Sequence, residues 1–166
     1  MQERSDALAR EGPDVQRYAA WLGEALAVAR QATGSEDVPV GAVVVAADGT
    51  LVGRGRNLRE ELGDPTAHAE VLALRAAAER LGGWRLDGCT LVVTLEPCAM
   101  CAGAAMAARL RRVVFGAWDA KAGACGSVWD LTRDPLALHP VDVVGGVRAE
   151  ESAGLLSDFF AARRLR

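Results

Sequence analysis

Four residues in two short segments have the types and spacing of a catalytic metal site. His68 and Glu70 are two positions apart in His-Ala-Glu, and Cys98 and Cys101 are three apart in Pro-Cys-Ala-Met-Cys. A catalytic zinc ion takes three protein ligands and keeps its fourth position for water. The two cysteines are one helical turn apart, so both sulfurs can face one ion. We therefore expect one Zn²⁺ per chain, bound by His68, Cys98 and Cys101.

Glu70 is expected to be the catalytic proton carrier and not a fourth ligand. Two thiolates and a neutral imidazole leave the zinc ion formally neutral, so a carboxylate that helps to deprotonate water is valuable. Both segments are expected at helix starts, where positive helix N-termini stabilise thiolates and a developing oxyanion. We expect the ion to lie off the N-termini of both helices.

Two other interpretations use the same residues. A Cys-x-x-Cys pair also occurs in redox motifs and in halves of structural zinc sites. A structural site needs a fourth ligand, which Cys89, Cys125 or His139 would have to supply. A non-enzymatic zinc-binding module has no need of Glu70, so the His-x-Glu pair favours a catalyst. Outside such a site, Cys89 and Cys125 are expected to be unreactive thiols and His139 a loop residue.

The elements expected around these segments alternate between helix and strand. Helices are expected at 14–33, 64–81, 97–110, 127–131 and 149–165, and strands at 40–47, 51–56, 90–95, 112–115 and 141–144. Residues 57–63 are expected to form a loop, and Asp64-Pro65 to open the second helix as N-cap and first-turn proline. This order predicts an α/β fold: a three-layer α/β/α sandwich with a mixed five-stranded sheet.

Length and composition suit one compact domain. The chain has 166 residues, of which 51% are hydrophobic. Residues 1–13 are expected to be a flexible leader and 14–166 a single domain. The net charge of −3 gives no global positive field, so a polyanion would need local basic patches. No apolar run is long enough for a membrane span, and the first ten residues lack a signal peptide's apolar stretch, so a cytoplasmic location is expected.

Longer segments resemble the bacterial tRNA-specific adenosine deaminases. His-Ala-Glu followed by Pro-Cys-x-x-Cys is the signature of the cytidine deaminase superfamily, to which these enzymes belong. The resemblance covers residues 15–166. It is carried by Val-Pro-Val-Gly-Ala at 38–42, Asp-Pro-Thr-Ala-His-Ala-Glu at 64–70, Thr-Leu-Glu-Pro-Cys at 94–98, Val-Phe-Gly-Ala at 114–117, Asp-Ala-Lys-Ala-Gly-Ala at 119–124 and Leu-Leu-Ser-Asp-Phe-Phe at 155–160 with Arg-Arg at 163–164.

The resemblance implies a homodimeric zinc hydrolase that acts on the anticodon arm of a tRNA. Its reaction would convert the wobble adenosine, position 34 of an arginine tRNA, to inosine with release of ammonia. His68, Cys98 and Cys101 match the zinc ligands. Water activated at the zinc would attack C6 of the flipped adenine, while Glu70 would carry the water's proton to N1 and then protonate the departing amine.

The resemblance also implies a set of contacts to the RNA. Asn57 matches a residue that hydrogen-bonds the purine, and Asp119 matches one near the RNA backbone. The full set of expected substrate-binding residues is Asn57, Ala67, Asp119, Phe159, Phe160, Arg163 and Arg164. From the residue types alone, Asn57 commonly serves a turn. Two adjacent phenylalanines on a helix cannot point the same way, so one of this pair is expected to be free to meet a base.

Other side chains are further candidates for RNA contacts. Trp118 and Trp129 can stack on bases or form dimer contacts. Basic side chains that can contact phosphates are Arg54, Arg56, Arg59, Lys121 and Arg166.

The nearest alternative function is a deaminase of a free base or nucleoside, of the guanine or cytosine type, which would share every zinc residue. The Asp119 loop and the closing Phe-Phe-x-x-Arg-Arg segment favour RNA.

Overall fold

The structure is a computed structural model that describes residues 13–165. The predicted leader lies outside the described residues, except for Pro13, which begins the first helix. The elements are α2 (Pro13–Arg30), β1 (Gly41–Val45), β2 (Leu51–Arg56), α3 (Arg59–Leu62), α4 (Ala69–Leu81), β3 (Thr90–Leu95), α5 (Ala99–Ala107), β4 (Arg112–Ala117), η1 (Leu131–Arg133), β5 (Asp142–Val144) and α6 (Ala149–Arg164). None of the helices described here combines the length and apolarity of a membrane span.

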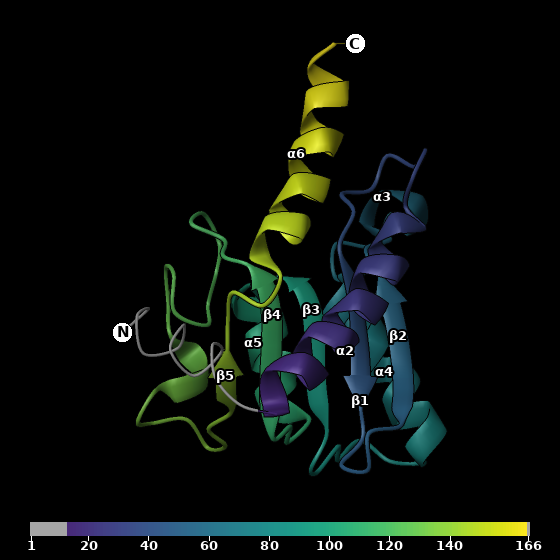
Figure 1. Ribbon diagram of the computed structural model, residues 1–166. Helices are drawn as coiled ribbons and strands as arrows, with labels where there is room; N and C mark the ends of the chain where they lie inside the picture. Colours follow the sequence, from purple (N-terminus) through teal and green to yellow (C-terminus); the bar gives the residue numbers. More distant parts are fainter. Residues whose placement is uncertain (1–12, 166) are drawn as a thin grey trace.

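The five strands form one mixed sheet between two helical layers, as predicted. The strand order is β2-β1-β3-β4-β5. Strand β1 runs antiparallel to both β2 and β3, whereas β3, β4 and β5 run parallel to one another. Helices α2 and α6 lie on one face of the sheet and α4 and α5 on the other (Figure 1). The predicted three-layer α/β/α sandwich is therefore confirmed.

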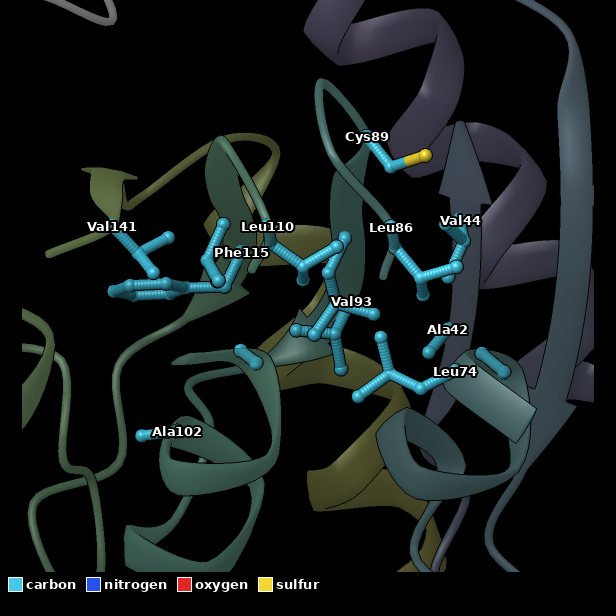
Figure 2. Packing of buried hydrophobic residues seen from close by; sticks show 14 of the residues in the cluster. Ala42, Val44, Leu74, Leu86, Cys89, Val93, Ala102, Leu110, Phe115 and Val141 are labelled. Carbon is cyan, nitrogen blue, oxygen red and sulfur yellow. The ribbon is translucent and has the colours of Figure 1, made fainter. Parts of the chain in front are cut away.

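Both faces of the sheet are buried by the helical layers. Successive side chains of a strand point to opposite faces, so each strand contributes to the packing on both sides. Val43 and Val45 of β1 belong to the cluster that packs against α2. Ala42 and Val44 of the same strand belong to the cluster beneath α4 and α5. Figure 2 shows this second cluster, in which Phe115 is fully buried. The two clusters hold both helical layers on the sheet.

Two glycines let α4 lie directly against β2. A Cβ atom at Gly53 would lie 2.4 Å from the carbonyl oxygen of Ala73, and one at Gly55 would lie 2.5 Å from that of Ala69. A side chain at either position would therefore push α4 away from the sheet. Because His68 is the N-cap of α4, these glycines also fix the position of a predicted zinc ligand.

We expect Gly55→Ala to lower the free energy of unfolding by about 1–3 kcal/mol, because overpacking a close contact displaces backbone. Gly83→Ala is the matched control, since a Cβ there meets nothing within 4 Å. The control should change stability by less than about 0.5 kcal/mol. Urea denaturation followed by circular dichroism gives both values, and equal values would contradict the close packing of α4 on β2.

Two predictions around the start of α4 were wrong. Asp64-Pro65 does not open the helix: the Asp64 carboxylate accepts a hydrogen bond from the backbone N–H of Thr66 at 2.8 Å, which closes a turn. The helix begins at Ala69, with His68 as its N-cap residue. The predicted loop at 57–63 instead contains the short helix α3, because the buried Asp37 carboxylate accepts hydrogen bonds from the backbone of the helix's first turn.

Other boundaries differ by a few residues. The short helix predicted at 127–131 is a 3₁₀ turn at Leu131–Arg133. Strand β4 continues two residues beyond its predicted end, to Ala117. Helix α2 ends at Arg30, three residues early, and α5 spans Ala99–Ala107 inside the predicted 97–110. None of these differences alters the topology, which depends on the type and order of the long elements.

Candidate active site

An open cavity of about 230 Å³ lies at the end of the sheet where β2, β3 and β4 terminate. Sites for drug-sized ligands occupy roughly 300–1,000 Å³, so this cavity suits a single small ring system. Its lining is Val38, Val40, Asn57, Arg59, His68, Ala69, Glu70, Leu95, Glu96, Cys98, Asp119 and Ala122. The sequence placed Asn57, His68, Glu70, Cys98 and Asp119 in one site, and the cavity brings these five together.

His68, Cys98 and Cys101 form a compact cluster beside this cavity. Their ligand atoms all lie within 4.8 Å of one another. His68 is the N-cap residue of α4 and Cys98 that of α5, so the cluster lies off the N-termini of both helices, as the sequence indicated. Within residues 13–165 no other group of three or more His, Cys, Asp or Glu side chains could hold a metal. Cys89, Cys125 and His139 therefore supply no fourth ligand.

The geometry of the cluster fits zinc. Nδ1 of His68 is 3.6 Å from Sγ of Cys98 and 3.5 Å from Sγ of Cys101. A tetrahedral zinc ion with ordinary Zn–N and Zn–S bond lengths separates such ligand atoms by about 3.6 Å. Two sulfurs and one imidazole nitrogen are also the donor set of catalytic zinc sites with one open position.

The two cysteines differ in their acid–base behaviour. The Cys101 thiol donates a hydrogen bond to the Cys98 sulfur, which lowers the pKa of Cys98 to about 3 and raises the pKa of Cys101. The Cys98 sulfur in turn raises the pKa of His68 by hydrogen bonding. The lowered pKa of Cys98 favours its thiolate, which is the form of cysteine that binds a metal. By contrast, burial raises the pKa of Cys89 and raises that of Cys125 to about 12, as expected for unreactive thiols.

Glu70 is a buried carboxyl group on the first turn of α4. Only 4% of the residue is exposed. Burial raises the pKa of Glu70 to about 7. A carboxyl group with a pKa near neutrality can both accept and release a proton during a reaction. Glu70 lines the cavity together with His68 and Cys98, which suits a proton carrier next to a metal.

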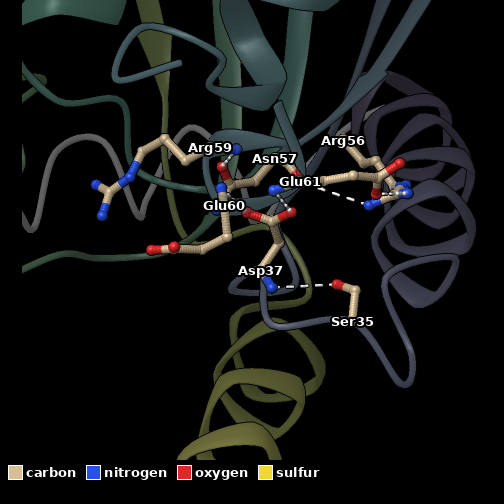
Figure 3. Close-up of polar contacts among 7 residues, drawn as sticks. All are labelled: Ser35, Asp37, Arg56, Asn57, Arg59, Glu60 and Glu61. Atoms are coloured by element: carbon tan, nitrogen blue, oxygen red, sulfur yellow. Dashed lines mark hydrogen bonds and ion pairs between the residues drawn. The ribbon is translucent and has the colours of Figure 1, made fainter. Parts of the chain in front are cut away.

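The segment after β2 forms one wall of the cavity. The side-chain amide of Asn57 donates to the carbonyl of Val38 at 3.2 Å, and its oxygen accepts from the backbone N–H of Arg59 at 3.1 Å. Asn57 therefore serves a turn while it lines the cavity. Asp37, 1% exposed, supports this wall by accepting hydrogen bonds from the N–H groups of Glu60 and Glu61 at 2.7 and 3.2 Å (Figure 3).

The opposite wall is the loop after β4. The Asp119 carboxylate accepts hydrogen bonds from the backbone N–H groups of Lys121 and Ala122, which closes a tight turn. Ala67, by contrast, is fully buried and does not line the cavity; its carbonyl oxygen accepts a hydrogen bond from the N–H of Leu58. Trp118 packs edge-on against Phe115, with ring centroids 4.7 Å apart, so this partly buried side chain packs against the core. Trp129 is 52% exposed.

Helix α6 projects beyond the cavity end of the sheet (Figure 1). None of its four predicted substrate-binding residues lines the cavity. The Phe159 and Phe160 rings meet at 77°, and the Arg163 guanidinium lies over Phe159, 4.4 Å from the ring centroid. Phe160 is 49% exposed, so it is the phenylalanine that remains free for another contact.

Several candidate phosphate-binding cations already contact acidic groups. Arg54 pairs with Glu24, Arg56 pairs with Glu61, and Arg163 binds both the carboxylate and the carbonyl oxygen of Glu36. Among the described residues, no ion pair is found for Arg59, Lys121 or Arg164. Arg59 is exposed and lines the cavity, so it is the best-placed cation for a charged substrate group.

Comparison with known proteins agrees with the site. The family described as the cytidine and deoxycytidylate deaminase zinc-binding region matches residues 15–117. The tRNA-specific adenosine deaminase of Bacillus subtilis is 46% identical over 88% of this chain and 89% of its own length. The chain belongs to the tRNA-specific adenosine deaminase family. The family and the site geometry together identify zinc as the cofactor. The cluster of His68, Cys98 and Cys101 has room for one ion.

Longer proteins contain a segment similar to this family member. A tRNA(Ile)-lysidine synthase from Deinococcus radiodurans is 57% identical over 87% of this chain. The chain spans only 25% of the length of that relative. The deaminase-like segment therefore also occurs within a protein named for another tRNA modification.

Solved structures similar to this chain include deaminases named for two kinds of substrate. A tRNA:A34 deaminase, described as editing A to I at the wobble position, is 45% identical with a TM-score of 0.79, covering 82% of this chain and 99% of its own. A guanine deaminase from Nitrosomonas europaea is 28% identical with a TM-score of 0.73, covering 86% of this chain and 84% of its own. The fold is therefore shared between a tRNA:A34 deaminase and a guanine deaminase.

Proposed function

We propose that this chain hydrolytically deaminates the wobble adenosine of a tRNA anticodon arm to inosine and releases ammonia. The observation that carries the deaminase activity is the cavity in which Glu70 lies beside the His68, Cys98 and Cys101 cluster. We assign these three residues as zinc ligands and Glu70 as the catalytic acid–base.

The residues of the cavity divide the reaction between them. When bound, zinc lowers the pKa of water so that it can attack the ring carbon that carries the amino group. Glu70 accepts one proton of the attacking water and delivers it to N1 of the adenine; it then takes the remaining proton of the hydroxyl added at C6 and passes it to the departing amine, which leaves as ammonia. Asn57, on the wall formed by the segment after β2, holds the purine. The small volume of the cavity limits the substrate to one base that has left its stack.

The RNA substrate is supported by features outside the zinc site. The relatives at 45–47% identity are named for tRNA or its wobble adenosine, whereas the guanine deaminase is 28% identical. Helix α6 and the loop after β4 extend the protein beyond the cavity and carry Phe160, Arg164 and Lys121. A free base would not reach these side chains. Because tRNA is the substrate, we place the protein in the cytoplasm.

We expect the anticodon stem-loop to exceed free adenosine, cytidine and guanine in kcat/KM by about 10²-fold or more. Stacking of neighbouring bases on aromatic side chains is worth roughly 1–3 kcal/mol each, and phosphate contacts add to it. A loop nucleotide is already unpaired, so extruding it costs less than opening a duplex. Steady-state ammonia release measures all four substrates. A free base or nucleoside with kcat/KM equal to that of the stem-loop would move the chain to the free-base branch.

We further propose that the protein is a homodimer joined through α4 and α5. An apolar groove lies between these helices, lined by side chains such as Val71, Trp84 and Ala104, and Trp84 is 61% exposed. Ala104→Glu should place a charge in this interface and yield monomers in sedimentation velocity. Leu136→Glu, at an 89% exposed position outside the groove, should leave the dimer intact. A dimer that survives Ala104→Glu unchanged would contradict this interface.

A further inference from the structure

Glu96 is a buried carboxylate between the end of β3 and the zinc ligand Cys98. The proposed reaction assigns proton transfer to Glu70 and does not use Glu96. The residue is 2% exposed. It accepts hydrogen bonds from the backbone N–H groups of Asp119 at 2.9 Å, Cys125 at 3.1 Å and Ser127 at 3.0 Å. The Ser127 hydroxyl donates a fourth hydrogen bond.

These four donors occupy both carboxylate oxygens. Oε1 receives the N–H groups of Cys125 and Ser127, and Oε2 receives the N–H of Asp119 and the Ser127 hydroxyl. An ionised carboxylate is purely an acceptor, and four donors satisfy it. Both Glu96 and Glu70 line the cavity, but the Glu96 carboxylate is engaged in holding backbone, whereas Glu70 lies beside the zinc ligands.

All four donors belong to the loop that forms one wall of the cavity. Asp119 and Ala122 of this loop line the cavity. The loop wraps closely around the carboxylate, because a Cβ atom at Gly123 would lie 2.2 Å from Oε2 of Glu96. A further hydrogen bond joins the N–H of Ala124 to the carbonyl oxygen of Pro97 at 2.8 Å. The substrate-facing wall is thus fastened to the segment that carries a zinc ligand.

We propose that Glu96 is a positioning residue that holds the loop 119–127 against the metal-ligand segment and thereby sets the affinity for the substrate base. Its negative charge organises the three backbone N–H groups from inside the loop. Glu96 acts through the loop, so its loss affects substrate binding more than the chemical step. This role is independent of whether the base arrives free or within RNA, because the loop lines the cavity in either case.

Glu96→Gln in the zinc-loaded protein tests the proposal. An amide keeps one acceptor oxygen, so one orientation leaves the N–H of Asp119 unpaired and the other leaves those of Cys125 and Ser127 unpaired. Hydrogen exchange of these loop amides should accelerate about tenfold or more. The reason is that a hydrogen bond to a charged group contributes more to stability than the free energy that corresponds to a tenfold change in an equilibrium constant. Zinc content should stay at one per chain, and KM should rise about tenfold with kcat within about twofold.

Asp37→Asn is the matched control, because Asp37 is an equally buried carboxylate that holds the other wall. It should accelerate exchange at Glu60 and Glu61 and leave the loop 119–127 unchanged. Ser127→Ala is the second variant, for use if Glu96→Gln does not fold. It removes one hydrogen-bond donor to Glu96 and should give the same changes in loop exchange and KM at smaller size. Unchanged loop exchange in Glu96→Gln, or a loss confined to kcat, would overturn the proposal. The exchange measurement needs no substrate, so its outcome is separate from that of the proposed tRNA activity.

Discussion

Glu70→Gln is expected to retain the fold and one zinc per chain while losing turnover by about 10²–10⁴-fold. Glutamine matches glutamate in size, so it fits the buried position, but the amide cannot accept the proton of the attacking water. The same group is needed again to protonate the ring and the departing amine, which favours the upper end of this range. Ammonia release at saturating substrate measures kcat, and metal analysis measures zinc in the same preparation.

Two results for this variant would change the assignment. Turnover close to that of the unchanged protein would remove Glu70 from the reaction. Loss of zinc with loss of turnover would make Glu70 a support of the metal instead of a proton carrier. A matched control is Glu79→Gln, which makes the same chemical change on the same helix at an exposed position outside the cavity and should keep full turnover.

Cys98→Ser is expected to remove most of the zinc and, with it, essentially all deamination. A serine hydroxyl is a far weaker zinc ligand than a thiolate, and a site left with two strong ligands does not hold the ion. Cys125→Ser is the matched control: Cys125 is buried but belongs to no metal-ligand cluster, so zinc content should stay at one per chain. Metal analysis after dialysis measures both variants. Full zinc in Cys98→Ser would show that the ligand set is wrong.

The chemical centre was predictable from the sequence because its spacing is local. Cys98 and Cys101 are one helical turn apart, and His68 and Glu70 follow from one helix start, so each half of the site is specified by a few adjacent residues. The sheet topology was predictable for a similar reason, since strands and helices alternate with clear turn residues between them. What remained was to bring the N-termini of α4 and α5 together. Strands β2 and β3 both run antiparallel to β1, so their C-terminal ends, which lead to α4 and α5, lie at the same end of the sheet.

The walls of the cavity were not predictable in the same way. Asp37 and Glu96 act on backbone N–H groups that lie 23 to 31 residues away in the sequence. For Asp37, nothing in the local pattern distinguishes the buried carboxylate from an exposed one. The short helix α3 was missed for this reason, because its first turn depends on Asp37. A carboxylate in an otherwise apolar or β-branched segment, as in Thr-Leu-Glu-Pro-Cys, was the one available signal.

The partners of the basic side chains were also hidden from the sequence. Arg163 was expected to contact RNA, yet it binds Glu36 from a distant part of the chain. An exposed pair of this kind contributes little to stability, and a phosphate can displace it. The net charge of −3 therefore does not exclude RNA, because only a few local cations near the cavity need to act.

Sequencing of a treated anticodon stem-loop tests the central claim most directly. The RNA should carry one adenosine at the wobble position and others in the loop and stem, and inosine is read as guanosine after reverse transcription. We expect A-to-G change at the wobble position alone, absent in Glu70→Gln. An unchanged stem-loop, in a preparation that holds one zinc per chain and releases ammonia from guanine or free nucleosides, would contradict the assignment of tRNA as the substrate.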